Sequence, residues 1–141
     1  MENMDKIKFH KSHLWIRFDR NLAYVGLSHI LIKRLGAIIY ISLPSEGIMI
    51  ESDQEVIGSI DAIKSTYDLL APFPGKLINV NKDLLQELDK IKNDPYGNWI
   101  FTIEVSDEIL PTIESNLLSA EEYETFWKSE RERSGNIPQC S

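Results

Sequence analysis

The sequence predicts a mainly β fold, a flattened β-barrel or sandwich of two small antiparallel sheets with short flanking helices and a C-terminal helix. Three observations favour it. Short runs rich in β-branched and aromatic residues alternate with turn residues along most of the chain. An apolar-Pro-x-x-Gly segment occurs twice, at 43–47 and 71–75, each time between two β-prone runs. Finally, Ser119 stands three residues before Glu122, a capping box that opens the last helix.

The first elements are a hairpin and a short helix. Residues 14–18 and 22–27 are β-prone runs separated by three polar residues, which predicts two paired strands. Ser28 is typical of a helix N-cap, and Gly36 is suited to end the helix after about two turns. The sequence therefore predicts a helix over 29–35.

The later elements alternate helix and strand. Apolar residues at 84, 85, 88 and 91 follow helical spacing behind Asn81, a candidate cap. The turn at 93–98 leads into a predicted strand over 99–105, whose odd positions should face the core. Residues 106–118 predict a helix broken early by Pro111, and the helix after Ser119 should run to about Arg133.

Composition limits the classes of function. A chain of 141 residues fits a single domain over 1–141 that buries a core without disulfides or metal. The net charge of −7 argues against a nucleic-acid or anionic-lipid partner and favours partners with basic clefts. No run approaches the roughly 18 apolar residues of a membrane span, so we expect a soluble protein without membrane contact.

The two ends of the chain carry no targeting or pairing signal. The first six residues resemble neither a secretory signal nor a transit peptide, and we expect a cytoplasmic protein and a monomer. Residues 134–141 should form a flexible tail. Its Cys140 is the only cysteine, so it cannot form an internal disulfide and has no metal-ligand spacing to a histidine.

Lys64 is the residue with the clearest chemical potential. It is the only basic residue in 60–69, close to the middle of two β-prone arms, so pairing of the arms would place it at a hairpin tip. An amine at such a tip can be reached by a modifying enzyme without unfolding its support. Taken alone, however, a lysine in a turn is usually a solvated surface charge.

Placed in order, these segments resemble the H protein of the glycine cleavage system, and the resemblance covers about 9–127. The matching positions, in chain order, are His13-Leu14-Trp15, Val25-Gly26-Leu27, Leu35-Gly36, Leu43-Pro44 with Gly47, Gly58, Asp61 with Lys64, Ala71-Pro72 with Gly75, Val80-Asn81, Asn93-Asp94-Pro95-Tyr96-Gly97 with Trp99, and Leu118 with Ala120-Glu121-Glu122-Tyr123. The fold implied is a barrel-sandwich hybrid of the lipoyl-domain type.

The resemblance implies a carrier rather than an enzyme, with lipoate in amide linkage to Lys64. The arm would carry an aminomethyl group among glycine decarboxylase, aminomethyltransferase and dihydrolipoyl dehydrogenase, after attachment by a lipoate ligase or lipoyl transferase. Asp61 lies three residues before Lys64, where the family usually has glutamate, and could be a recognition mark for the ligase. A solvated carboxylate is the alternative.

Some positions depart from the family pattern. Ala37 stands where an aspartate is usual, Ala62 where a serine is frequent, and Asn98 joins Trp99 without an extra glycine. Two alternatives therefore stay open. One is an H-like lipoate-binding carrier of a bacterial sulfur-oxidation pathway with a heterodisulfide-reductase-like complex; the other is a non-lipoylated interaction protein on the same scaffold.

Other kinds of site have little support. His10, His13 and His29 show no metal-ligand or catalytic spacing and should be structural or surface residues. Trp15 and Trp99 lie on predicted strands and should belong to the core rather than to a nucleotide-stacking surface. The sequence therefore predicts no metal and no catalytic residue.

Overall fold

The computed structural model describes the backbone of residues 7–134 and the side chains of residues 7–130. Its strands are β1 (Ile7–His10), β2 (Leu14–Asp19), β3 (Leu22–Leu27), β4 (Ile38–Ser42), β5 (Met49–Ile50), β6 (Val56–Ala62), β7 (Thr66–Leu70), β8 (Gly75–Val80) and β9 (Phe101–Glu104). Its α-helices are α1 (His29–Leu35), α2 (Lys82–Leu85), α3 (Asp89–Asn93), α4 (Leu110–Asn116) and α5 (Ala120–Ser134), and a 3-10 turn spans Pro95–Gly97. The tail was predicted over 134–141; Ser134 instead ends α5, and residues 135–141, with Cys140, lie outside the described residues.

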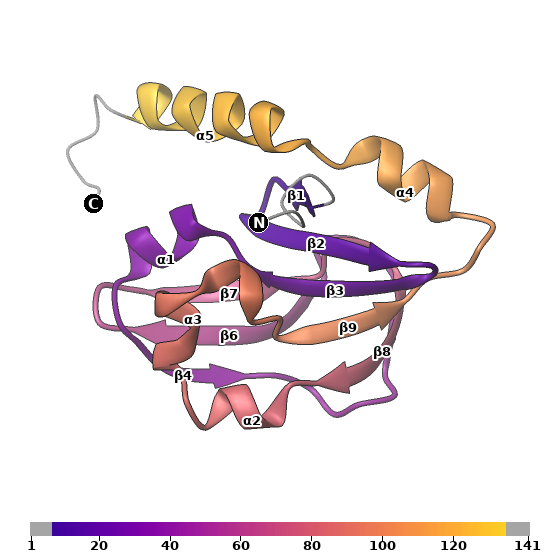
Figure 1. The fold of residues 1–141 in the computed structure, drawn as a ribbon, viewed down its shortest axis with the longest axis horizontal. Coiled ribbons are helices and arrows are strands. Elements are labelled where there is room, and N and C mark those ends of the chain that lie inside the picture. Colours follow the sequence, from indigo (N-terminus) through magenta and orange to yellow (C-terminus); the bar gives the residue numbers. More distant parts are fainter. Residues whose placement is uncertain (1–6, 135–141) are drawn as a thin grey trace.

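The strands form two antiparallel sheets that do not close into a barrel (Figure 1). Six strands pair in the order β1-β2-β3-β9-β8-β5, and three pair in the order β4-β6-β7. Of the two forms predicted from the sequence, the sandwich is the correct one. Strand β9, late in the chain, pairs between β3 and β8, so the larger sheet depends on contacts between distant segments.

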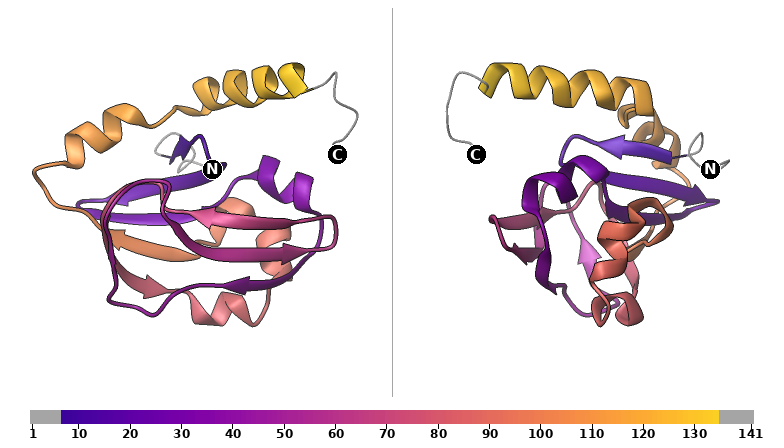
Figure 2. Two further views of the ribbon diagram at one scale, coloured as in Figure 1. Left: turned by 180° about the vertical axis from the view of Figure 1, so that it is seen from behind. Right: turned by 60° about the vertical axis from the view of Figure 1, so that its left-hand side comes forward.

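Two apolar clusters hold the layers together. The larger lies between the sheets and includes Leu27, Ile60 and Leu77, none of which exposes measurable surface. The second lies under α5, which crosses the outer side of β1 (Figure 2). There the rings of Phe9 and Tyr123 stack with centroids 4.4 Å apart. Burial of these aromatic surfaces holds α5 on the sheet.

Several elements follow their local signals. The Ser28 hydroxyl accepts a hydrogen bond from the Leu31 N–H at 3.2 Å, which caps α1 as predicted. The capping box of α5 is present, with Glu122 N–H donating to the Ser119 hydroxyl at 3.1 Å and Ser119 N–H donating to the Glu122 carboxylate at 2.8 Å. These helix starts depend on contacts within four residues, so sequence is enough to predict them.

Three expectations were wrong in detail. The helix expected from Asn81 to Ile91 is two helices, with a break between Leu85 and Asp89. Pro111 does not break a helix but lies in the first turn of α4, where its missing N–H costs nothing. The strand expected over 99–105 is shorter, Phe101–Glu104; its odd positions Phe101 and Ile103 are buried as expected, and Thr102 is buried as well.

Candidate functional site

Lys64 lies at the tip of the β6–β7 hairpin, at the left of Figure 1 near the end of α1. The hairpin closes with the Ala62 N–H donating to the Ser65 carbonyl at 3.0 Å. Lys64 is exposed, and among the described side chains no carboxylate forms an ion pair with its Nζ. The hairpin predicted from the sequence is confirmed, and its amine faces solvent.

The tip is anchored by the segment that ends α1. The Lys64 N–H donates to the Leu35 carbonyl at 3.1 Å, and the Ile63 N–H donates to the Ala37 carbonyl at 2.9 Å. Two backbone hydrogen bonds therefore hold the tip on either side of Gly36. Among residues 7–130, the side-chain Nζ makes a single long contact of 3.4 Å, to the Lys33 carbonyl. The backbone of the tip is fixed while the amine is weakly held.

The backbone of the segment that anchors the tip turns at Gly36 in a conformation that favours glycine. Its φ of 76° and ψ of −151° lie in a region that side chains disfavour. A Cβ at this position would stand 3.4 Å from Cγ and Cε of Lys64, so the lysine stem lies directly over the glycine. The end of α1 is thus a platform for the Lys64 side chain.

Asp61 lies on the outer face of the smaller sheet. In register it pairs with Tyr40 of β4 on one side and Thr66 of β7 on the other, and it is exposed. The next residues on this strand, Ile60 and Ala62, belong to or pack against the core, so Asp61 points away from it. Its recognition role stays a prediction.

A polar cluster, which we call the His13 cluster, joins α1 to α5 beside the platform. His13 is 4% exposed, and its Nδ1 lies 2.7 Å from the hydroxyl of Tyr123, which lies 2.7 Å from the Ser28 hydroxyl. The His13 Nε2 is 3.0 Å from a Glu130 carboxylate oxygen and 3.1 Å from Nη1 of Arg34. Arg34 also pairs with Glu130 at 3.1 Å.

Burial determines the charge states in this cluster. Desolvation is the main cause that lowers the pKa of His13, against the opposing effect of Glu130, so the ring is neutral near pH 7. A neutral ring can either donate from Nε2 to Glu130 or accept there from Arg34, but cannot do both. Close to this cluster, burial raises the pKa of Tyr67 to about 12, and the Tyr67 hydroxyl donates to the Ser12 carbonyl. The cluster buries His13 and connects it to α5, which fits the structural role expected for this residue.

Sequence reasoning did not find the His13 cluster because its members are far apart. His13 and Glu130 are separated by 117 residues and His13 and Tyr123 by 110. Of the other two histidines, His10 contacts the nearby Ser12 hydroxyl, whereas His29 contacts the hydroxyl of Tyr96, 67 residues away in the chain. Among the described residues, no group of three or more His, Cys, Asp or Glu side chains could hold a metal ion.

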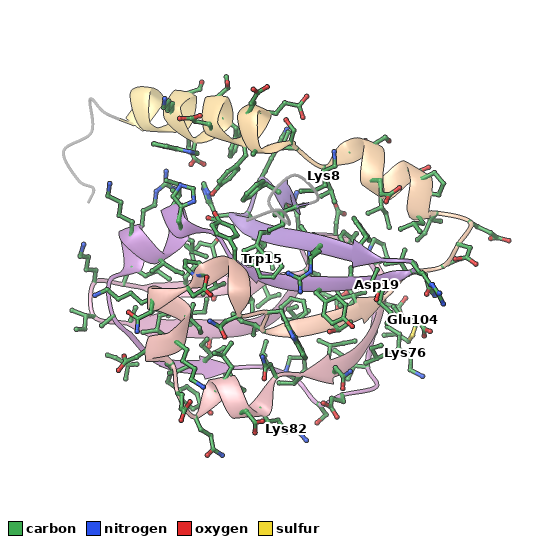
Figure 3. All side chains as sticks on the ribbon, in the orientation of Figure 1. Lys8, Trp15, Asp19, Lys76, Lys82 and Glu104 are labelled. Atoms are coloured by element: carbon green, nitrogen blue, oxygen red, sulfur yellow. The ribbon has the colours of Figure 1, made fainter. Side chains whose placement is uncertain are left out.

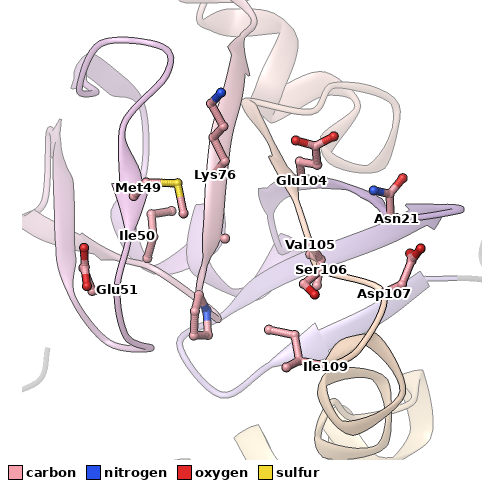
Figure 4. A pocket seen from close by; sticks show the side chains of 12 residues that line it. Asn21, Met49, Ile50, Glu51, Lys76, Glu104, Val105, Ser106, Asp107 and Ile109 are labelled. Atoms are coloured by element: carbon pink, nitrogen blue, oxygen red, sulfur yellow. The ribbon is translucent and has the colours of Figure 1, made fainter.

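Two open hollows on the surface of residues 7–130 are relevant here, and they lie in different places. The first, of about 550 Å³, is lined by residues of several segments between Asn21 and Ile109, among them Met49 and Glu104 (Figure 4). Glu104 and Lys76 lie at the right of Figure 3, away from the hairpin tip. The second, of about 590 Å³, is lined by Ile39 and residues 85–90.

Comparison with known proteins agrees with this geometry. Residues 7–130 match the family model described as glycine cleavage H-protein. The chain belongs to the glycine cleavage H-protein family. The glycine cleavage system H protein of Thermoanaerobacter sp. (strain X514) is 32% identical over 130 residues, covering 92% of this chain and all of the relative. That of Coprothermobacter proteolyticus is 36% identical over 129 residues, covering 89% and 98%.

A solved structure supports the same assignment. The crystal structure of a glycine cleavage system H protein from Mycobacterium marinum matches with a TM-score of 0.71 and 25% identity, covering 86% of this chain and 95% of the other. The family resemblance found in the sequence is therefore confirmed. The lipoyl carrier of glycine cleavage is favoured over the sulfur-pathway carrier and the non-lipoylated protein. No helix within residues 7–134 is long and apolar enough to cross a membrane.

Proposed function

We propose that this H-protein family member carries lipoate in amide linkage on Lys64 and shuttles an aminomethyl group. Its partners would be glycine decarboxylase, aminomethyltransferase and dihydrolipoyl dehydrogenase. The observation that carries the proposal is the presentation of Lys64: an exposed amine on a hairpin tip whose backbone is bonded to Leu35 and Ala37. A carrier of this kind takes part in the reaction as a substrate of its partners rather than as their catalyst.

The surroundings of Lys64 fit a covalently held group. Amide formation removes the charge of the amine, so a lysine in a strong ion pair would lose a favourable interaction on modification. Within the described part of the chain, the Lys64 Nζ makes only the 3.4 Å contact with the Lys33 carbonyl, which costs little to break. When bound, lipoate supplies a disulfide that can be opened by reduction and can accept the transferred group.

The backbone at the hairpin tip is fixed, whereas the Lys64 side chain is only weakly held. The anchoring bonds to Leu35 and Ala37 hold the backbone at the tip, while the four-carbon stem of Lys64 crosses Gly36 without a side chain in its way. An arm on this stem can swing without distorting the sheet. Fixing the base and freeing the arm is the arrangement that a carrier visiting several active sites needs.

Asp61 is proposed to help the attaching enzyme recognise the hairpin. Its carboxylate points outward from the same hairpin, three residues before Lys64, and it forms no ion pair among the described residues. A basic group of a lipoate ligase or lipoyl transferase could pair with it. The net charge of −7 would likewise favour brief, salt-sensitive contacts with basic clefts of all the partners.

Mass spectrometry of the purified chain tests the proposal. Incubation with lipoate, ATP and a lipoate ligase should add the mass of one lipoyl group, on the peptide that contains Lys64. Lys64→Arg should abolish the addition, whereas Lys33→Arg, which keeps a cation on the adjacent platform, should leave it intact. An unmodified wild-type chain, or a lipoyl group on another lysine, would contradict the proposal.

Reconstitution separates the proposed cargo from the alternatives. The lipoylated chain, mixed with glycine decarboxylase and aminomethyltransferase, should support release of carbon dioxide from glycine and transfer of the one-carbon unit to tetrahydrofolate. A lipoylated chain that is inactive with both enzymes would favour a different cargo.

A further inference from the structure

Three large apolar side chains are exposed around the hairpin tip. Within residues 7–130, six large apolar residues are exposed, and the β4–β6 register places three of them at the end of the ladder next to Lys64: Ile63 at 70%, Ile39 at 63% and Tyr40 at 58%. We call these three residues the tip patch. Apolar groups are normally buried where neighbouring core allows it, so a group of three beside one functional lysine indicates contact with another molecule.

The β4–β6 register explains why the tip patch is exposed. Ile38 pairs with Ala62, but the next pair is Tyr40 with Asp61, so one extra residue, Ile39, is inserted in β4. A bulge of this kind breaks the in-out alternation and turns successive side chains to one face. Ile39 therefore leaves the core and lies diagonally across the ladder from Ile63, within reach of it.

The tip patch extends from Lys64 to a concave region. Ile63 is the residue directly before Lys64, and Ile39 also lines the hollow of about 590 Å³ beside residues 85–90. Leu85 and Leu88 are half-buried and contribute apolar surface to that hollow. A partner that covers Lys64 from this side meets an apolar ridge followed by a hollow, a shape that can be packed closely.

The chemistry at Lys64 decides which partner must cover this patch. Amide formation joins the acyl carbon of an activated lipoate to Nζ itself, with loss of a proton from the amine and departure of the activating group. The attaching enzyme must therefore bring its active site onto Nζ and onto the residues beside it. The enzymes that act later reach the sulfur atoms at the far end of the arm, so they do not need to touch Ile63.

We propose that the tip patch is the docking surface for the enzyme that attaches lipoate, and that this enzyme presents an apolar rim around the mouth of its active site. The inference rests on the proposed function and adds the surface that determines recognition. Asp61 pairs in register with Tyr40, so its carboxylate lies at the edge of the same patch and could set the orientation of the enzyme.

Initial rates of lipoylation test the inference. Ile39→Ser and Ile63→Ser should each lower kcat/KM for modification of Lys64 by about tenfold, mainly through a higher KM for the carrier. Val56→Ser is the matched control, because Val56 lies at the other end of β6 with 59% exposure. Its rate should stay within about twofold of wild type. Ile63→Val, which keeps an apolar side chain, should retain most of the rate.

Two further measurements make the result decisive. Labelling of Lys64 by a small amine-reactive reagent should be unchanged in both serine variants, and so should reduction of the fully lipoylated variants by dihydrolipoyl dehydrogenase. Serine variants lipoylated at the wild-type rate would overturn the docking role. So would a loss of rate matched by an equal loss of reagent labelling, because the loop itself would then have changed. If the wild-type chain is not lipoylated at all, the result refutes the proposed function itself rather than the docking role of the tip patch.

Discussion

Replacing Gly36 by alanine tests the platform under Lys64. The glycine has φ 76° and ψ −151°, a combination that costs a side-chain-bearing residue about 1–3 kcal/mol. The new Cβ would stand 3.4 Å from the Lys64 stem, an ordinary contact, so backbone strain should be the main cost. For a chain of this size we expect the thermal midpoint to fall by about 3–12 °C.

Gly47→Ala is a control that distinguishes the cost of backbone strain from an effect on lipoylation. Gly47 also has a positive φ, of 98°, but nothing lies within 4 Å of its Cβ position, and it is remote in sequence from the hairpin tip. Gly47→Ala should therefore lower the thermal midpoint with little change in lipoylation. Gly36→Ala should lower both, because the anchoring carbonyls of Leu35 and Ala37 flank the strained residue. Thermal unfolding followed by circular dichroism, with lipoylation rates in parallel, gives the comparison. An unchanged midpoint in Gly36→Ala would refute the reasoning.

Three other predictions concern stability. Gly26→Ala should cost more than either substitution above, because its Cβ would meet the buried Trp15 ring at 2.5 Å; a chemical denaturation midpoint at or above that of Gly47→Ala would argue against this. Ser119→Ala removes the α5 capping hydrogen bond and should cost about 1 kcal/mol, measured by urea unfolding, with Ser129→Ala as the control in mid-helix. Stability should also fall as the pH is lowered from about 7 to 5. Burial lowers the folded-state pKa of His10, His13 and His29 below 6.5, so the unfolded chain binds more protons in this range. Thermal midpoints across this pH range should show a smaller slope in His13→Asn, and an equal slope would exclude His13 as a contributor.

Much of the candidate site could be predicted from the sequence because the residues that form it lie close together along the chain. The two β-prone arms around Lys64 are sufficient to indicate a hairpin, and the helix between Ser28 and Gly36 has its start and end signals within eight residues. The order and spacing of motifs that resemble the H-protein family indicated that Lys64 occupies the position that carries lipoate. Sequence alone could not show that Leu35 and Ala37 anchor the tip, since no local pattern encodes a bond between a helix end and a distant hairpin.

The sequence by itself thus determined the capped helix ends, the hairpin that presents Lys64 and the family to which the chain belongs. These depend on side chains within a few residues of one another or on their order along the chain. Only the tertiary structure decided the pairing of β9 between β3 and β8, the bulge that exposes Ile39, and the contact of His13 with Glu130. Each of these requires segments far apart in the chain to meet, and which segments meet depends on how the whole core packs.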